Sequence, residues 1–414
     1  MTEATDLRDE TQPRLGRGFV IGLLAVTSVG PLSMQLFAPA LPAISREFGV
    51  SIGRAQLALS LSMLSIAVAT LVYGPLSDRL GRRPVLFAGL LLFLAGTLLC
   101  TLAGSIEALI WGRVLQAGGA AAGIVVARAI GGDLYGPDQA ARIIAYLSAA
   151  VVGAPMVAVA LGGVITDIGG WRHTFAFAFA CGVAAIFFVQ WGVPETRSRA
   201  VRAADPSGIL RDYGRVLHAL PSFIGYALHA ACGGATFFAF MAAAPHLMAD
   251  TLHRPASAFG FYFALVTLAF MLSSWVGARW CTRVGVDRMM LAGGVSALVV
   301  SLLALIGLNR FGLSEATLFI PAAIIAMSFS LSLPTATAGA VAPLPHVAGT
   351  ASAMLGFLQM IVGAAAAQVA GALSDGSGIP LLLCVAVLSA VAVLAGLVPP
   401  LRRWRAGLAV QTRP

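Results

Sequence analysis

Long apolar runs separated by short polar breaks make up most of the 414-residue chain. A helix of roughly 20 apolar residues crosses the hydrocarbon core of a bilayer, and these runs have about that length. Backbone polar groups in lipid must pair within their own segment, which favours helices. The pattern predicts twelve transmembrane helices, at about 19–41, 56–73, 85–103, 108–129, 143–166, 175–193, 222–244, 259–278, 290–308, 318–341, 348–372 and 379–398.

Glycine and proline gather in three of the expected helices, near 31–42, 153–163 and 334–345. Proline removes a backbone donor and bends or breaks a helix, and membrane helices tolerate this where neighbouring groups satisfy the freed backbone atoms. We expect these three segments to be kinked or interrupted.

The longest polar stretch, 194–220, separates two groups of six expected helices. The groups echo each other weakly, after their second helices (Gly74 to Gly81, Gly277 to Gly285) and in a GxxxD pattern that closes their fifth (Gly163 and Asp167, Gly371 and Asp375). Two such repeats around a central cavity are typical of transporters that rock between two states.

The sequence therefore predicts an all-α membrane protein of twelve transmembrane helices in two six-helix pseudo-symmetric bundles. Its expected parts are a cytoplasmic tail (1–18), an N-terminal bundle (19–193), a cytoplasmic linker (194–220), a C-terminal bundle (221–400) and a second cytoplasmic tail (401–414).

The basic residues test this topology. All 26 are arginine, and with both termini in the cytoplasm 20 of them fall in cytoplasmic segments and 5 in external loops. Cytoplasmic loops carry an excess of basic residues, so the distribution supports this orientation. The first apolar run lacks a cleavage site of small residues and is expected to be a retained helix. We predict a multi-pass membrane protein with both termini in the cytoplasm.

Composition excludes several other classes. Hydrophobic residues make up 59% of the chain and charged residues 10%, against about 25% charged in soluble domains. The net charge of +9 does not indicate nucleic-acid binding, because the arginines form short runs without interleaved aromatic residues. The five cysteines show no CxxC spacing, which favours free thiols over a metal site or disulfides.

Enzymatic activity is also disfavoured. The chain has no soluble domain and no clustered catalytic groups, so a membrane-bound sensor or enzyme is a weak alternative. It also lacks a GxxxxGK[ST] loop, which argues against direct use of ATP. We expect no cofactor and no metal.

A charged segment, GPLSDRLGRRP, lies between the second and third expected helices. A carboxylate there, Asp78, can cap helix N-termini and pair with arginines, and so hold the cytoplasmic side shut. We expect a tight loop that forms a cytoplasmic gate with residues that follow the fourth helix. The predicted gate consists of Gly74, Asp78, Arg79, Gly81, Arg82, Arg83, Arg128 and Asp133.

Arg113 is expected inside the membrane, within GRVLQAGGAAAG of the fourth helix. A charge at that depth is costly unless it faces a wet cavity or a partner, which favours a functional role. His229 is a weaker candidate for a proton carrier. Aromatic residues and Met in the seventh and eighth helices favour an apolar, adaptable cavity. The predicted substrate or proton cavity comprises Gln35, Phe37, Arg113, Gln116, His229, Phe237, Phe238, Met241 and Gln359.

The charged segment at 74–84 resembles the signature loop of the major facilitator superfamily, in which that loop is a latch. The fourth helix is similar to the family motif whose arginine takes part in proton transfer or substrate binding. The fifth helix, GAPMVAVALGG, is similar to the antiporter motif, and its small residues permit close helix contact and a kink. The expected residues of this motif are Gly153, Pro155, Gly162 and Gly163.

With GWRHTF at 170–175 and PET at 194–196, the chain resembles the bacterial drug-resistance (bicyclomycin/chloramphenicol-type) drug:proton antiporters. The resemblance implies a monomer in the lipid bilayer of the bacterial inner membrane. It would export small amphipathic molecules by alternating access in exchange for protons.

Two positions depart from that pattern. Gln35 stands where the subfamily has an aspartate in LSMQLFAPALP, and Val159 stands where antiporters have a proline. Glutamine cannot titrate, which puts proton coupling through the first helix in doubt. With Arg113 and no acid in the first helix, the alternative is a transporter of an anionic or zwitterionic metabolite that is not coupled to protons.

Overall fold

The computed structural model describes residues 17–134, 137–196, 214, 216, 220–343 and 348–405. Within these ranges the chain is almost entirely helical and contains no strand. Twelve helices of the described part are long and apolar enough to cross a membrane, which confirms the predicted number.

The elements form two groups of six spans. The first group contains α1 (Arg17–Phe37), the 3₁₀ turn η1 (Ala38–Ala40), α2 (Leu41–Phe48), α3 (Ile52–Leu80), α4 (Arg82–Thr101), α5 (Ile106–Leu134), α6 (Pro137–Gly169) and α7 (Trp171–Gly192). The second contains α9 (Leu220–His246), the π-helical turn η3 (Leu247–Thr251), α10 (Ala256–Val284), α11 (Val286–Phe311), α12 (Glu315–Val341), α13 (Ala348–Ala372) and α14 (Ile379–Arg405).

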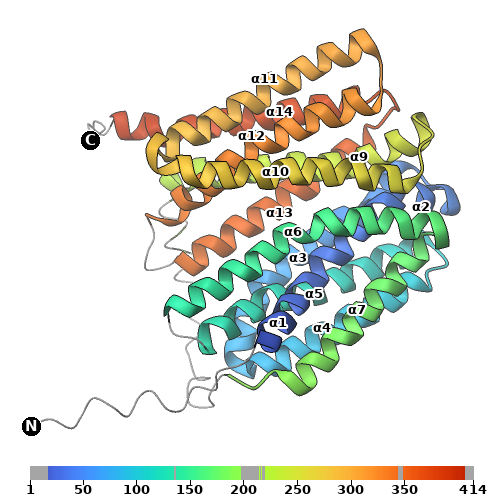
Figure 1. The fold of residues 1–414 in the computed structure, drawn as a ribbon, viewed down its shortest axis with the longest axis vertical. Coiled ribbons are helices and arrows are strands. Elements are labelled where there is room, and N and C mark those ends of the chain that lie inside the picture. The colour runs from blue at the N-terminus through green and yellow to red at the C-terminus, as the bar shows by residue number, and fades with distance from the viewer. Residues whose placement is uncertain are drawn as a thin grey trace, which may run out of the picture.

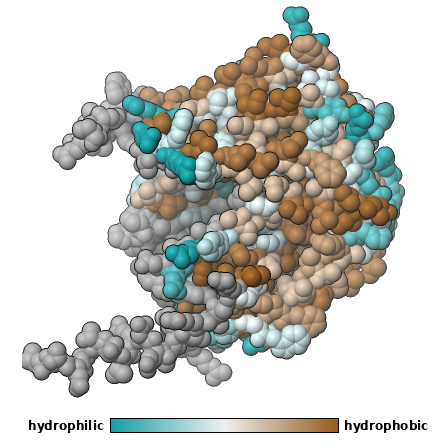
Figure 2. All heavy atoms as spheres, in the orientation of Figure 1, coloured by the Kyte–Doolittle hydropathy of each residue, from teal (hydrophilic) through white to brown (hydrophobic). Residues whose placement is uncertain are grey.

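Figure 1 shows the two groups as two halves of one molecule, α1 to α7 below and α9 to α14 above. In this view α14 ends at the left, and α1 begins toward the same end of the molecule and runs toward the right. We call the end where α1 begins and α14 ends the termini side, and the opposite end the far side. The halves meet along two seams, α3 against α13 and α6 against α10. Figure 2 shows apolar residues over most of the visible face and polar residues toward its left and right edges, as expected of a lipid-exposed surface.

Single glycines make several of the turns between helices. Gly81 (φ 105°) separates α3 from α4, and Gly285 (φ 89°) separates α10 from α11 at the corresponding place in the second half. A positive φ is readily adopted only by glycine, which explains the glycine echo in the sequence. The expectation of a loop at 74–84 is corrected, because Gly74–Leu80 continue α3 and Arg82 already begins α4.

The three proline-containing segments behave differently. The segment near 31–42 is interrupted at η1, where Pro39 precedes the start of α2. In contrast, α6 runs unbroken through Pro155 and α12 runs unbroken through Pro334, so the expected interruptions do not occur there. Membrane helices accommodate such prolines where local adjustments satisfy the freed carbonyl groups.

Contacts between the halves lie toward the far side. In the first seam they join Gly53, Gln56, Ser60 and Met63 of α3 to Gly363, Gln368, Gly371 and Ala372 of α13. In the second they join Ala160, Gly163 and Asp167 of α6 to Ala256, Ser257 and Gly260 of α10. All these residues belong to the far-side halves of their helices. Toward the termini side α6 and α10 diverge (Figure 1), and the structure is therefore closed on the far side.

Candidate transport site

A charged cluster occupies the termini-side end of α3, α4 and α5. Arg82, which begins α4, lies 2.9 Å from the Asp78 carboxylate and 3.0 Å from that of Asp133. The Arg82 side chain is 8% exposed and also donates to the Ser77 hydroxyl. Since charge-assisted bonds in a shielded position are strong, Arg82 is the centre that holds three helix ends together.

The segment after α7 completes this cluster. The Glu195 carboxylate accepts a hydrogen bond from the Arg82 backbone N–H at 3.0 Å, and the Thr196 hydroxyl donates to Asp133 at 3.0 Å. Sequence reasoning noted PET at 194–196 only as a family resemblance. The structure gives two of its residues a physical role, which is to fasten the end of the first half to the start of α4.

Three of the predicted gate arginines lie apart from this core. Arg83 donates to the Gln190 carbonyl of α7. Arg79 and Arg128 are exposed, and among the described residues no ion pair joins either to Asp78 or Asp133. The structure therefore brings Asp78, Arg82 and Asp133 together and leaves Arg128 outside.

Arg113 of α5 is enclosed within the first half and is 1% exposed. Its Nη1 donates to the Gln116 side-chain oxygen at 2.6 Å and to the Ser33 carbonyl at 3.4 Å. The guanidinium also lies over the Phe37 ring, 4.6 Å from its centroid. Gln116 in turn donates to the Thr97 hydroxyl of α4 at 2.9 Å, so this polar group joins α1, α4 and α5.

The Arg113 hydrogen bonds are incomplete. Its Nε and Nη2 are buried with no hydrogen-bond partner, and its bonded partners in the described part of the chain include no carboxylate. A buried cation with free donors is costly, and the contacts of Arg113 offset only part of that cost. The arrangement can receive an acceptor atom once a path to it opens.

The remaining polar candidates occupy separate places. Gln35 of α1 is buried, and Gln359 of α13 is half-buried. His229 of α9 is fully buried inside the second half, where its Nδ1 lies 2.9 Å from the Ala392 carbonyl of α14 and its Nε2 has no partner. The structure does not bring His229 together with Arg113.

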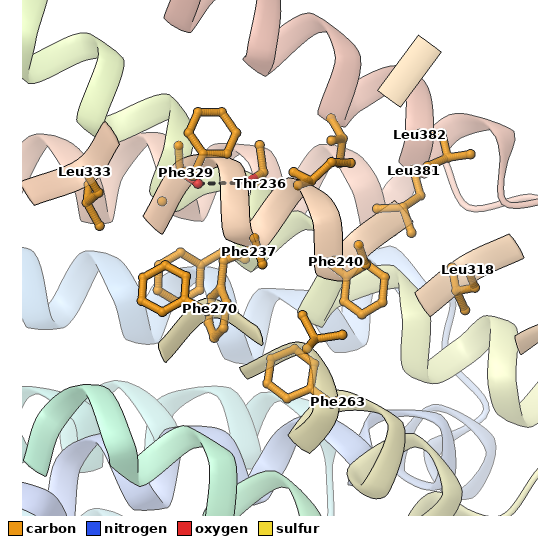
Figure 3. A pocket seen from close by; sticks show the side chains of 18 residues that line it. Thr236, Phe237, Phe240, Phe263, Phe270, Leu318, Phe329, Leu333, Leu381 and Leu382 are labelled. Atoms are coloured by element: carbon orange, nitrogen blue, oxygen red, sulfur yellow. Dashed lines mark hydrogen bonds between the residues drawn. The ribbon is translucent and has the colours of Figure 1, made fainter. Parts of the chain in front are cut away.

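A cavity in the second half has an almost wholly apolar lining (Figure 3). Its empty space is about 900 Å³, including its open side. Of the predicted cavity residues, Phe237 and Phe238 line this cavity, whereas Met241 is buried in the neighbouring core. The other lining residues include Thr236 and Phe240 of α9, Phe263 and Phe270 of α10, Phe329 and Leu333 of α12, and Leu381 and Leu382 of α14.

Thr236 is the polar exception in this lining. Its hydroxyl donates to the Gly233 carbonyl at 2.7 Å, so only its lone pairs remain for a ligand. The rings of Phe237 and Phe263 meet edge to face, with 5.5 Å between their centroids. The cavity therefore suits an aromatic or aliphatic group with at most one donor near Thr236.

One apolar cluster connects the two sites. It contains Phe37, on which Arg113 lies, and Met63 from the first half, and Phe238 and Met360 from the second half pack against it. Phe238 also lines the apolar cavity. The cluster therefore lies between the halves. It contacts Arg113 through Phe37 and the cavity through Phe238.

The glycines of the fifth-helix motif divide into two groups. A Cβ on Gly162 would lie 2.5 Å from the Leu36 carbonyl oxygen, and one on Gly163 would lie 2.5 Å from that of Ala256. These two glycines permit backbone approach to α1 and to α10. Gly153, before Pro155, has open space at the same position.

Sequence reasoning missed a histidine near the far side. His246, 2% exposed, lies 3.3 Å from the Asp250 carboxylate, and its Nε2 has no partner. The pair spans the start of the π-helical turn η3, a rare conformation that is frequent at functional sites. The sequence does show a histidine and an aspartate four residues apart. They follow directly after an apolar run, however, where polar residues are expected simply because the membrane segment ends.

Two six-helix halves that meet on one side and diverge on the other are an architecture of membrane transporters. The chain belongs to the Major Facilitator Superfamily, whose sequence pattern matches residues 23–367. This confirms the resemblance predicted from the charged segment at 74–84.

Among its relatives is Multidrug resistance protein D of Escherichia coli, which is 30% identical over 82% of this chain and 84% of that protein. The Chloramphenicol resistance protein of Pseudomonas aeruginosa is 30% identical over 78% and 76% of the two chains. Among solved structures, a bacterial homolog of the human lysosomal transporter Spinster, in an inward-facing and unoccupied conformation, matches with a TM-score of 0.71 at 16% identity over 93% and 94% of the two chains.

Proposed function

We propose that this protein exports small amphipathic molecules across the bacterial inner membrane by alternating access, in exchange for protons. Both termini lie in the cytoplasm in this proposal, so the termini side is the cytoplasmic side and the structure is open toward the cell interior. Drug-resistance relatives and the distribution of the arginines support this assignment.

The apolar cavity of the second half is the observation that carries the proposal. Its aromatic lining and single hydroxyl can hold hydrophobic groups of varied shape, and none of its lining residues is charged. A cavity without a charge favours neutral molecules or the apolar part of an amphipathic one, because no lining group would compensate a desolvated ion. Substrate would enter between the diverging ends of α6 and α10.

The charged cluster around Arg82 supplies the proposed cytoplasmic gate. In this open state its contacts with Asp78 and Asp133 lie within the first half. When the halves rock together on the termini side, the α3 end that carries Asp78 approaches α13, its partner in the first seam. The Asp78 carboxylate would then interact with the positive N-terminal end of α13.

Arg113 is the proposed centre of coupling in the first half. A fixed cation beside Gln116, without a carboxylate partner, raises the cost of a second positive charge nearby. Once a path to Arg113 opens, a cationic substrate and a proton would therefore exclude each other near it rather than bind together. The alternative, an anionic metabolite carried without protons, would use the two free Arg113 nitrogens as its receptor.

Liposome uptake tests the proposal. The purified protein is reconstituted, and uptake of cationic, neutral and anionic compounds is followed with and without an imposed pH gradient. Gradient-driven movement of neutral or cationic compounds supports drug:proton exchange. Preference for anions, or movement that ignores the gradient, would contradict it and favour the alternative.

A pair of phenylalanine variants tests the cavity. Phe237→Ala removes a lining ring and should weaken substrate binding by roughly tenfold, which corresponds to about 1.4 kcal/mol of lost contact. Phe261→Ala is the matched control, because Phe261 on α10 is 59% exposed and does not line the cavity. Equal affinities in the two variants would place the substrate elsewhere.

A further inference from the structure

The far-side ends of α6 and α10 share a contact that substrate binding does not explain. Asp167, near the end of α6 in the first half, accepts two hydrogen bonds from the start of α10 in the second half. Its Oδ1 lies 2.9 Å from the Ala256 backbone nitrogen, and its Oδ2 lies 2.9 Å from that of Ser257. One carboxylate thus caps a helix that belongs to the opposite half.

The local sequence of α10 explains why the cap comes from outside. The first backbone N–H groups of a helix have no intrahelical partner, and the residue before the helix commonly supplies a side-chain oxygen. Here that residue is Pro255, which has no such oxygen. The carboxylate also lies at the positive end of the helix dipole, where an anion is stabilised.

The other seam is built differently. Its helix α3 is capped within its own chain segment by the Ser51 hydroxyl, which accepts from the Arg54 backbone N–H at 3.3 Å. The residue that matches Asp167 in the repeated GxxxD pattern is Asp375, near the end of α13. Asp375 accepts from the backbone N–H and the hydroxyl of Ser377 at 2.9 and 2.7 Å, and these bonds hold its pKa below the ordinary value.

Close packing accompanies the Asp167 cap. A Cβ on Gly163 would lie 2.5 Å from the Ala256 carbonyl oxygen, and one on Gly260 would lie 2.7 Å from the Val159 carbonyl oxygen. The backbones of α6 and α10 are therefore in direct contact over the last turns before the cap. Separation of these helices must break both Asp167 bonds and expose the α10 N–H groups to water.

From these contacts we infer that Asp167 is a latch between the halves, which stabilises the state closed on the far side and is released when that side opens. The GxxxD pattern of α6 combines the two requirements of this latch, a glycine for backbone contact and a carboxylate one turn later for the cap. The inference concerns the conformational equilibrium and holds whatever the substrate is.

Removal of the latch should shift the equilibrium toward the state open on the far side. An N-cap contributes about 1 kcal/mol, so loss of this contact corresponds to about a fivefold change. Asp167→Asn is the test variant, because the amide keeps the shape but loses the charge and one acceptor. Asp375→Asn is the matched control, since the Asp375 bonds described above stay within its own loop.

Hydrogen exchange of the full-length protein in detergent provides the first measurement. Amide exchange in the first turn of α10 should be about fivefold faster in Asp167→Asn than in the unmodified protein, and unchanged in Asp375→Asn. Equal exchange rates in the two variants would overturn the cap.

Disulfide formation at the other seam provides a second measurement that a merely local effect would not change. A Cβ on Gly53 would lie 3.3 Å from the Ala372 Cβ, near the usual separation in a disulfide of about 3.5–4.5 Å. The double variant Gly53→Cys with Ala372→Cys should therefore cross-link while the far side is closed. Mass spectrometry of the linked peptide should show slower formation when Asp167→Asn is added.

A third variant separates the latch from the stability of α10. Pro255→Ser gives the helix a cap residue of its own, and combined with Asp167→Asn it should restore slow exchange in α10 but leave cross-linking slow. If cross-linking recovers together with exchange, Asp167 serves only the local helix and the latch is refuted. Unchanged cross-linking in Asp167→Asn alone would refute it as well.

Discussion

Arg113 is completely buried but incompletely hydrogen-bonded. We therefore expect its replacement to affect the stability of the fold and the transport activity in opposite directions. Two of its nitrogens are buried without a partner, while the third side-chain nitrogen bonds Gln116 and Ser33. Removal of a charge from water costs several kcal/mol, and the Phe37 ring and the carbonyl recover only part of this.

Replacement of Arg113 by methionine should therefore stabilise the fold and abolish transport. An apolar residue of similar volume in place of a poorly paired buried ion is neutral or favourable by about 1–4 kcal/mol. The measurement is the midpoint of thermal unfolding in detergent, beside uptake into liposomes. A lower midpoint together with normal uptake would show that Arg113 is structural.

The sequence was sufficient to predict that Arg113 lies inside the membrane segment but not which residues it contacts. A charge in a membrane segment stands out on any hydropathy profile, whereas the partners Ser33 and Thr97 are ordinary polar residues on other helices. Their meeting depends on helix rotation, which apolar periodicity leaves open in segments that are apolar on every side. For the same reason, the sequence could not predict that His229 lies away from the Arg113 site.

At the scale of elements, backbone contact between α6 and α10 depends on Gly163. Gly163→Val should weaken closure of the far side, because the new side chain would meet the Ala256 carbonyl oxygen and the Ser257 Cα. Gly153→Val is its control on the same helix, since Gly153 has open space. Cross-linking of the engineered cysteine pair at positions 53 and 372 should fall several-fold only in the first variant; equal yields would contradict the prediction.

The Asp78 gate makes a separate prediction. Asp78→Asn removes one of two carboxylates from Arg82, and Asp133 still holds that arginine. Membrane insertion and thermal stability should therefore change little, while uptake into liposomes should fall by about tenfold or more, because a neutral side chain interacts weakly with a helix N-terminus. Uptake at the normal rate would exclude the gate.

Helix number and order could be predicted, but helix length could not. The second apolar run was expected at 56–73, and α3 covers Ile52–Leu80. Hydropathy reports the part of a helix that lies in lipid, whereas α3 continues through the polar residues Ser77, Asp78 and Arg79 and ends at Leu80. The turn occurs at Gly81, whose positive φ is readily adopted only by glycine. GPLSDRLGRRP contains two glycines, and the sequence alone does not show which of them makes the turn.

At the scale of the whole molecule, the division into two halves was visible in the polar stretch at 194–220 and in repeated glycines. The seams were not, because they depend on pairs such as Gly163 with Ala256 that lie far apart in the sequence. The GxxxD pattern showed the glycine and the aspartate that α6 contributes to its contacts with α10. Their partners on α10 carry no recognisable signature.

Reporter fusions can test the orientation of the chain in the membrane. If the C-terminus lies in the cytoplasm, as we propose from the arginine excess, a fluorescent protein fused after Pro414 should be bright, because such a reporter matures there. An alkaline phosphatase fusion at the same point should be inactive, and a fusion in the far-side turn after Gly312 should be active. The reverse pattern would invert the topology.

The cap that Asp167 gives to α10 runs in one direction only, from the first half to the second. The two halves are therefore not interchangeable parts, although their helices follow the same order. A chain assembled from two copies of the first half would carry a self-capped helix at both seams and leave Asp167 with no uncapped helix to bind. Each half of the present protein therefore has its own part in this contact, because the first half supplies the carboxylate and the second half supplies the helix that lacks a cap.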